Sequence, residues 1–254
     1  MRALDVAQAW LALGADVFDA DGARFVRDRR FPGLPGCNFV SHVTAASPAA
    51  IERLLERVGQ EFAGLPFRQF QVDARTPPPF EARLVLDGYR REDALILVLD
   101  GPLRGDAPVH DVRPIADGDG WRAWEALNVI DWREYRERTA ATEDLAHGAA
   151  VAASRRAKCP PVRYWLAYDG GTPAGFFSAW EGIGGAGIVE NLYVRAECRR
   201  RGFATALVHA CVADARARGA GPVVIVTDPA DWPKRFYASL GFRPCAVKSA
   251  YLLK

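Results

Sequence analysis

One segment of the chain joins a strand-like run, a cationic loop and a helix-like run without interruption. Residues 188–194 are apolar and β-prone, three arginines follow at 199–201, and apolar side chains recur at helical spacing from 204 to about 218. Arginines oppose the usual preference at a helix start, because that end of a helix carries partial positive charge. A bound anion resolves the conflict, since free backbone N–H groups and the helix dipole converge on phosphate. Gly202 lets the backbone approach closely, so the segment predicts a phosphate-binding strand–loop–helix unit.

Two motifs in the later half resemble those of the GNAT N-acetyltransferase superfamily. Arg199, Gly202 and Ala204 match its acetyl-coenzyme A signature, Arg/Gln-x-x-Gly-x-Gly/Ala, and residues 232–242 resemble its Leu/Phe-Tyr-x-x-x-Gly-Phe block. The resemblance covers roughly residues 109–254. It implies an α/β fold with a central, mixed, mostly antiparallel sheet flanked by helices. It also implies transfer of an acetyl group from acetyl-coenzyme A to a primary amine of a small molecule or peptide, by direct attack in a ternary complex.

The resemblance assigns a set of residues to the coenzyme. Arg199 and Arg200 would supply charge, and backbone N–H groups from about Arg201 to Thr205 would supply directional hydrogen bonds. Asp228 is a departure, because family members often place Asn near this position. The residues expected to contact acetyl-coenzyme A are Leu192, Tyr193, Val194, Arg199, Arg200, Arg201, Gly202, Phe203, Ala204, Thr205, Asp228 and Phe236.

Two residues are expected to carry the chemistry. By resemblance, Tyr237 is the general acid that protonates the leaving thiolate, and a phenol with a pKa near 10 stays protonated at neutral pH. A backbone N–H near Tyr193 or Val194 would polarise the acetyl carbonyl. Glu190 could deprotonate the amine directly or through water, or bind a cationic substrate. The alternatives are that Tyr237 is a core aromatic and that Glu190 is an ordinary surface carboxylate.

Aromatic residues of the later half are candidates for an acceptor pocket. Trp132 and Tyr135 lie between the first two predicted helices of that half, where the family builds its acceptor site, and Trp180 is a third candidate. Core packing explains these residues equally well. The five cysteines show no Cys-x-x-Cys and no histidine spacing suited to zinc, so no metal site is predicted.

The first hundred residues repeat the order of predicted elements in shortened form. A polar Gly/Pro stretch at 101–108 marks the boundary, so we predict a degenerate GNAT-like domain at 1–105 and an acetyltransferase domain at 109–254. The first copy lacks a phosphate loop, because residues 45–49 contain no glycine and no cation. It is therefore expected to be structural, or to form a wall of the substrate site.

Composition limits the remaining partners. A formal net charge of +2 implies no nucleic-acid partner, and no apolar run is long enough to predict a membrane segment. Scattered cysteines without a disulfide pattern indicate reduced thiols in a cytoplasmic protein. The sequence does not predict the oligomeric state.

Two other interpretations compete with acetyl transfer from a coenzyme bound at the arginine loop. Residues 182–187 formally match Gly-x-Gly-x-x-Gly, but they run into a strand instead of a helix, which favours a hairpin loop over a dinucleotide site. A non-catalytic acyl-coenzyme A-binding sensor that kept the phosphate loop is the second interpretation. The presence of Tyr237 and Glu190 argues against it.

Overall fold

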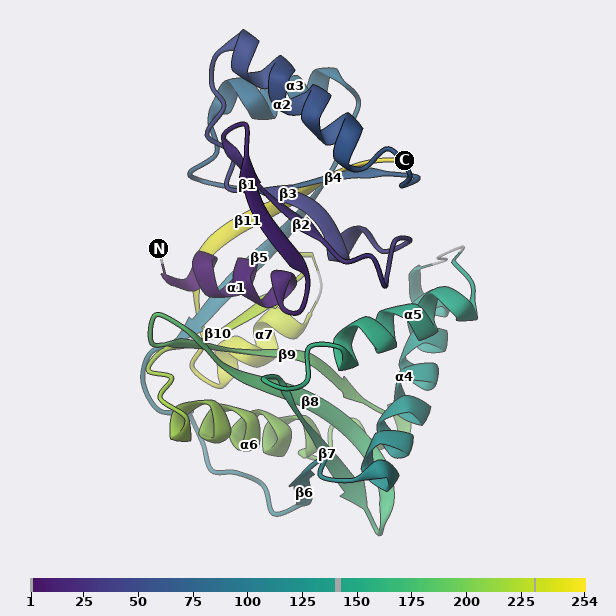
Figure 1. Cartoon of the computed structure of the whole chain (residues 1–254). Coiled ribbons are helices and arrows are strands. Elements are labelled where there is room, and N and C mark those ends of the chain that lie inside the picture. The colour runs from purple at the N-terminus through teal and green to yellow at the C-terminus, as the bar shows by residue number, and fades with distance from the viewer. Residues whose placement is uncertain (1, 140–142, 231) are drawn as a thin grey trace.

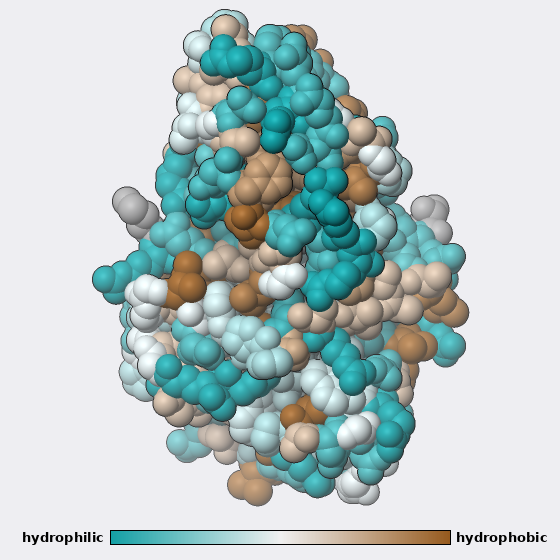
Figure 2. All heavy atoms as spheres, viewed as in Figure 1, coloured by the Kyte–Doolittle hydropathy of each residue, from teal (hydrophilic) through white to brown (hydrophobic). Residues whose placement is uncertain are grey.

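The computed structural model describes residues 2–139, 143–230 and 232–254. Within them the strands form one sheet in the order β1-β2-β3-β4-β11-β5-β10-β9-β8-β7-β6. Most neighbouring strands are antiparallel, and the pairs β3–β4 and β9–β10 are parallel. The predicted mixed, mostly antiparallel α/β sheet is therefore confirmed. Figure 2 shows the molecule as a narrow upper lobe on a broader lower one, with a mostly hydrophilic surface on this face.

The first half begins with a helix that the sequence analysis did not predict, α1. Its α2 begins at a capped end, because the Ser47 side chain accepts a hydrogen bond from the N–H of Ala50 and Pro48 occupies the first turn. The elements of this half are α1 (Arg2–Ala12), β1 (Asp16–Ala20), β2 (Ala23–Arg27), η1 (Pro35–Cys37), β3 (Asn38–Ser41), α2 (Pro48–Glu61), β4 (Arg68–Asp73), α3 (Pro78–Leu86) and β5 (Arg90–Leu99).

In the later half, the first helix, α4, continues to Thr139. Trp132 and Tyr135 therefore lie on this helix, and the prediction that they lie between two helices is wrong. The turn between β8 and β9 lies inside residues 182–187, which confirms the hairpin loop there. The elements are β6 (Asp111–Pro114), α4 (Gly118–Thr139), α5 (Leu145–Arg156), β7 (Arg163–Asp169), β8 (Thr172–Ile183), β9 (Ala186–Val194), η2 (Ala196–Cys198), α6 (Phe203–Ala217), β10 (Val223–Thr227), α7 (Pro233–Ser239) and β11 (Arg243–Leu253).

Helices cover both faces of the sheet (Figure 1). In the lower lobe, α6 and α7 pack on one face, where Leu97 and Ile225 point, and α1 and α4 pack on the other, where Ile96 and Val224 point. This opposition follows from the alternation of side chains along each strand. In the upper lobe, α2 and α3 pack over β2, β3 and β4 as a third buried cluster. Among the helices in the described residues, none is both long enough and apolar enough to span a bilayer.

The two halves exchange their last strands. β11, from the later half, lies between β4 and β5, while β5, from the first half, pairs with β10. Residues 248–253 of β11 pair with β4, and residues 95–99 of β5 pair with β10. The sheet therefore continues across the stretch at 101–108 that marks the predicted domain boundary, and the division at 1–105 and 109–254 stays a prediction.

Candidate active site

The arginine loop leads from η2 into the first turn of α6. Arg200 and Gly202 both have left-handed backbone conformations, with φ values of 60° and 89°. The first N–H groups of a helix have no intrahelical partner. In the part of the chain that the structure describes, those of Phe203, Ala204 and Thr205 donate to no protein acceptor. The loop thus presents free donors at the positive end of a helix, as an anion site requires.

The three arginines of the loop differ in their partners. Arg199 Nε donates to the Val194 carbonyl oxygen at 2.9 Å, and its guanidinium pairs with Glu134 on α4. Arg201 pairs with Asp169 at 2.7 Å. Arg200 is exposed and forms no ion pair with any described residue. Two arginines therefore hold the loop in place, and the Arg200 guanidinium is exposed to solvent.

Glu134 is a residue that the sequence analysis missed. Besides its pair with Arg199, its carboxylate accepts a hydrogen bond of 2.9 Å from the Tyr193 hydroxyl. It thereby ties α4 to the end of β9 and to the arginine loop. Its sequence context, one charged residue among many on α4, gives no signal for this role.

The connection between the halves also packs on the loop. His110 Nε2 lies 2.8 Å from the carbonyl oxygen of Arg201, and its ring stacks on Phe203 with centroids 4.0 Å apart. A Cβ atom on Gly202 would lie 3.0 Å from His110 Nε2 and 3.1 Å from Pro108 Cβ. Any side chain at Gly202 would therefore both strain the backbone and displace this connection.

Glu190 lies where β9 and β10 separate. These strands pair only at Gly187–Val223 and Ile188–Val224. One step further along, the Val226 N–H donates at 2.9 Å to the Glu190 carboxylate instead of to β9 backbone. Burial raises the pKa of Glu190 to about 7, although the hydrogen bond from Val226 and the charge of Lys248 oppose the rise. Glu190 is thus a carboxyl group that changes charge near neutral pH.

β9 bulges directly after Glu190. Its register with β8 shifts by one residue between Phe176 and Ser178, and Asn191 has a positive φ of 63°. The Asn191 side chain is held by a 3.0 Å hydrogen bond to the Tyr164 hydroxyl. A bulge leaves one residue outside the ladder, and here the Asn191 N–H acts on the Glu190 carboxylate, whose pKa it helps to lower.

Tyr237 is packed on α7 in the core of the later half. Its ring contacts Phe236 and Phe242, with centroids 5.2 and 5.8 Å away, and its hydroxyl bonds to no described residue. Burial, and then the nearby Glu190 carboxylate, raise the pKa of Tyr237 above its ordinary value. The phenol is therefore a protonated donor throughout the neutral range.

Lys248 is a second charged residue that the sequence analysis missed. It lies on β11, opposite Asp73 of β4, and is buried. Burial lowers its pKa, and the Glu190 carboxylate acts in the opposite direction. A lone lysine in a strand gives no sequence signal for this placement, because the exchange of strands brings it there.

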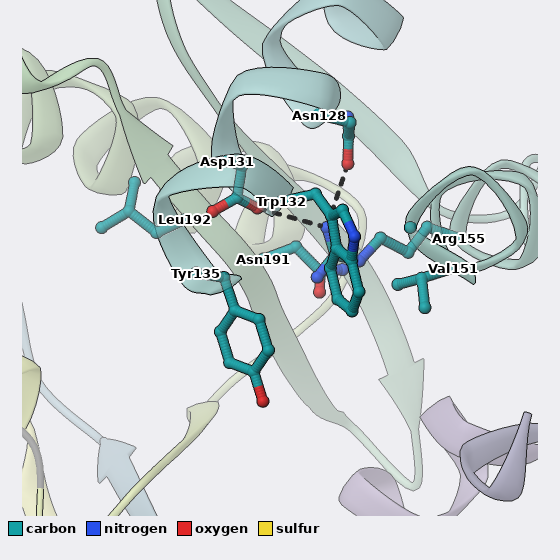
Figure 3. Close-up of a pocket in the computed structure, with 9 residues that line it drawn as sticks. Asn128, Asp131, Trp132, Tyr135, Val151, Arg155, Asn191 and Leu192 are labelled. Carbon is teal, nitrogen blue, oxygen red and sulfur yellow. Dashed lines mark hydrogen bonds and ion pairs between the residues drawn. The ribbon is translucent and has the colours of Figure 1, made fainter. Parts of the chain in front are cut away.

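A cavity of about 310 Å³ opens between α4, α5 and the bulge of β9. Trp132 and Tyr135 line it and stack with ring centroids 5.3 Å apart. Arg155 reaches from α5 toward Asn128 and Asp131 on α4 (Figure 3). Burial raises the pKa of Asp131, and Arg155 opposes the rise. The cavity therefore has aromatic walls and polar groups: the Asp131 carboxyl, the Asn128 and Asn191 amides and the Arg155 guanidinium. Asn191 is the residue that follows Glu190 in the chain.

Some predicted site residues lie elsewhere or have structural partners. Trp180 packs in the core against Trp10, with ring centroids 6.4 Å apart, and lines no part of this cavity. The Asp228 carboxylate accepts a 2.6 Å hydrogen bond from the N–H of Ala230 in its own turn. Leu192 lines the cavity, whereas Phe236 packs against the core beside Tyr237.

Gly148 fixes how closely α5 approaches the cavity. A Cβ atom there would lie 2.4 Å from the Trp132 ring. Gly148→Ala should therefore lower the free energy of unfolding by about 1–3 kcal/mol through overpacking. Gly59→Ala in α2 is the matched control, because nothing lies within 4 Å of its Cβ position and alanine there should add about 0.5–1 kcal/mol. Urea unfolding measures the free energy of unfolding of both variants. If Gly148→Ala stabilised the protein as much as Gly59→Ala does, the close approach of residue 148 to the Trp132 ring would be contradicted.

Comparisons with known proteins agree with this geometry. Residues 121–242 match the acetyltransferase (GNAT) family, so this segment is a GNAT-family domain. A search of curated proteins found no match to the sequence.

Three solved structures resemble the chain as a whole. A GCN5-related N-acetyltransferase from Kribbella flavida is 16% identical with a TM-score of 0.70, over 99% of this chain and 95% of that one. A functionally unknown conserved protein from Staphylococcus epidermidis is 13% identical with a TM-score of 0.69, over 94% of each chain. A tandem GNAT protein from the clavulanic acid biosynthesis pathway is 15% identical with a TM-score of 0.62, over 91% of this chain and 78% of that one. The predicted fold class is confirmed, the first half agrees with a truncated second copy, and family and fold indicate an acetyltransferase.

Proposed function

We propose that the protein transfers an acetyl group from acetyl-coenzyme A to a primary amine of a small molecule or peptide, by direct attack in a ternary complex. The observation that carries the proposal is the position of Glu190. It combines a pKa of about 7 with a place in the gap between β9 and β10, one residue before Asn191, which lines a cavity with polar walls. A base with a pKa near the working pH is well suited to removing a proton.

The arginine loop fits the pyrophosphate of the coenzyme. The free N–H groups of Phe203, Ala204 and Thr205 would supply donors, and the exposed guanidinium of Arg200 would supply positive charge. Acetyl-coenzyme A would supply an activated thioester. The first half has no comparable loop, so one coenzyme per chain is expected.

Glu190 and Tyr237 would each carry out one of the two proton transfers of the reaction. The Glu190 carboxylate would take a proton from the attacking amine, directly or through water. A backbone N–H at the β9 bulge would stabilise negative charge on the acetyl oxygen. The Tyr237 hydroxyl would donate a proton to the leaving sulfur, since its raised pKa keeps it protonated.

A panel of amines tests the proposal on the full chain. Free thiol released from acetyl-coenzyme A should exceed the hydrolytic background with at least one class of amine, and calorimetry should give one coenzyme site per chain. Coenzyme binding without turnover on any amine would instead support the non-catalytic acyl-coenzyme A sensor. Two equivalent coenzyme sites would contradict the assignment to the arginine loop alone.

Arg200→Glu should weaken binding of coenzyme A by about ten- to a hundredfold, because it replaces an unpaired cation beside the anion by a like charge. The fold should be unchanged, since Arg200 forms no ion pair with any described residue. Arg29→Glu in the first half is the matched control, because Arg29 is also exposed. Calorimetry at low and high salt measures both variants. Equal affinity in all three proteins would remove Arg200 from the site.

A further inference from the structure

A second cavity of about 230 Å³ adjoins the one between α4 and α5. Val151, Arg155 and Asn191 line both, so the two cavities meet at the Arg155 side chain. The far wall of the second cavity comes from the first half, from the end of α1 and from the residues around η1. A ligand that reaches past Arg155 from β9 would therefore contact both halves of the chain.

The charges that line the two cavities differ. The first contains Asp131 together with Arg155. The second contains Arg155 and Lys158, and among the described residues no aspartate or glutamate lines it. Asp28 acts on Lys158 from outside the lining and is itself paired with Arg30 at 2.8 Å. The pair of cavities is thus polarised, because its lining carboxyl group, Asp131, lies in the first cavity, whereas Arg155 at the junction and Lys158 beyond it give the second a positive charge.

Lys158 retains capacity for a ligand. Its ammonium donates to the carbonyl oxygens of Trp10 and Leu11 at 3.0 and 2.9 Å, at the end of α1. An ammonium group has three donors, so one remains. Burial lowers the pKa of Lys158, and a carboxylate placed beside it would favour the charged form.

We propose that the two cavities bind a single acceptor, a primary amine that carries a carboxylate at its other end. The amine lies in the first cavity, against Asp131 and beside Asn191, the residue that follows Glu190 in the chain. The carboxylate lies in the second, against Arg155 and Lys158, so the first half of the chain helps to select the acceptor. A diamine is disfavoured, because its second cation would meet Arg155 and Lys158 in the second cavity. This inference rests on the proposed function and adds the acceptor's chemical class.

A series of ω-amino acids with their matched amides tests the inference. Glycine, β-alanine, 4-aminobutyrate and 6-aminohexanoate vary the distance between amine and carboxylate, and each amide removes only the charge. For at least one length, kcat/KM should be about tenfold or more higher for the acid than for the amide. Calorimetric affinities of the same pairs, measured with coenzyme A present, should show the same preference.

Variants at Lys158 test whether the preference for the acid over the amide arises in the second cavity. Lys158→Met keeps an unbranched side chain and should abolish most of the acid-over-amide ratio, whereas Lys158→Arg should retain it. The ratio compares two ligands on one protein, so a loss of stability from the weakened end of α1 does not alter it. Lys254→Met, which removes an exposed charge paired with Glu143, should leave the ratio unchanged.

The outcomes separate the two proposals. Amines acetylated equally as acid and amide, or a ratio unchanged in Lys158→Met, would overturn this inference and leave the acetyltransferase intact. Absence of turnover on every amine would defeat the proposed function, and the calorimetric preference would then decide the inference by itself. Failure of every carboxylate in the series to bind would overturn it as well.

Discussion

Replacing Glu190 by glutamine should lower the turnover number by about 10²–10⁴-fold, the usual contribution of a positioned general base. Glutamine keeps the size of the side chain and can still accept the hydrogen bond from the Val226 N–H. In the parent, kcat/KM should rise with pH through about 7, because only the ionised carboxylate takes a proton and burial raises its pKa to that value. This limb should be absent from the variant. Steady-state rates between pH 5.5 and 9 measure both effects.

The same substitution should also change stability in a pH-dependent way. The pKa of Glu190 is about 7 in the folded protein against 4.5 as its ordinary value, so the native state holds a proton that the unfolded chain has released. The free energy of unfolding of the parent therefore falls between about pH 4.5 and 7, and stays lower above that. At pH 8, Glu190→Gln should be more stable than the parent by roughly 1–2 kcal/mol. The measurement is the denaturation midpoint of each protein at pH 5 and at pH 8. If the difference between the two proteins were the same at both pH values, the Glu190 carboxyl group would be well hydrated in the folded state.

Tyr237→Phe should lower turnover by about 10²-fold with little change in coenzyme affinity. The ring and its contacts with Phe236 and Phe242 remain, while the proton for the leaving thiolate is lost. Because burial raises the pKa of Tyr237, any alkaline limb that it causes in the parent should lie above pH 10.

Tyr251→Phe is the matched control for this variant. Tyr251 is also buried, and its hydroxyl bonds to Glu81 in the upper lobe. It should retain full turnover despite the loss of one hydroxyl group. A Tyr237→Phe turnover number within a factor of about two of the parent, with an acceptor for which chemistry limits the rate, would make Tyr237 a packing residue only.

The parts of this molecule that could be predicted from sequence depend on local signals. The arginine loop has its motif within a few residues, and the helices and strands around it have caps, glycines and periodic apolar positions. The length of β5 was not predictable, because its first residues, Arg90 to Asp93, are charged and become strand only through pairing with β11. Long-range pairing of this kind has no local signature.

In the candidate site, too, local sequence signals do not reveal the features that depend on long-range contacts. Trp132 and Trp180 are equally plausible pocket residues in the sequence, yet one lines a cavity and the other packs against Trp10. The difference depends on α1, a helix that was not predicted. Glu134 and Lys248 likewise acquire their roles from partners far away in the chain. Tertiary contacts, not residue type, decide which polar groups of this protein lie at the site.

The exchange of β5 and β11 has a consequence for how the chain folds. During synthesis, β4 has an open edge until the ribosome releases residues 243–253, because its neighbour on that side is the last strand. Open edges invite pairing with other chains, and pairing over such a sequence separation is slow. The strand pairing of the upper lobe is therefore complete only after β11 has been synthesised. For the same reason, a gene fusion or recombination event that cut the chain between the halves would leave two incomplete sheets.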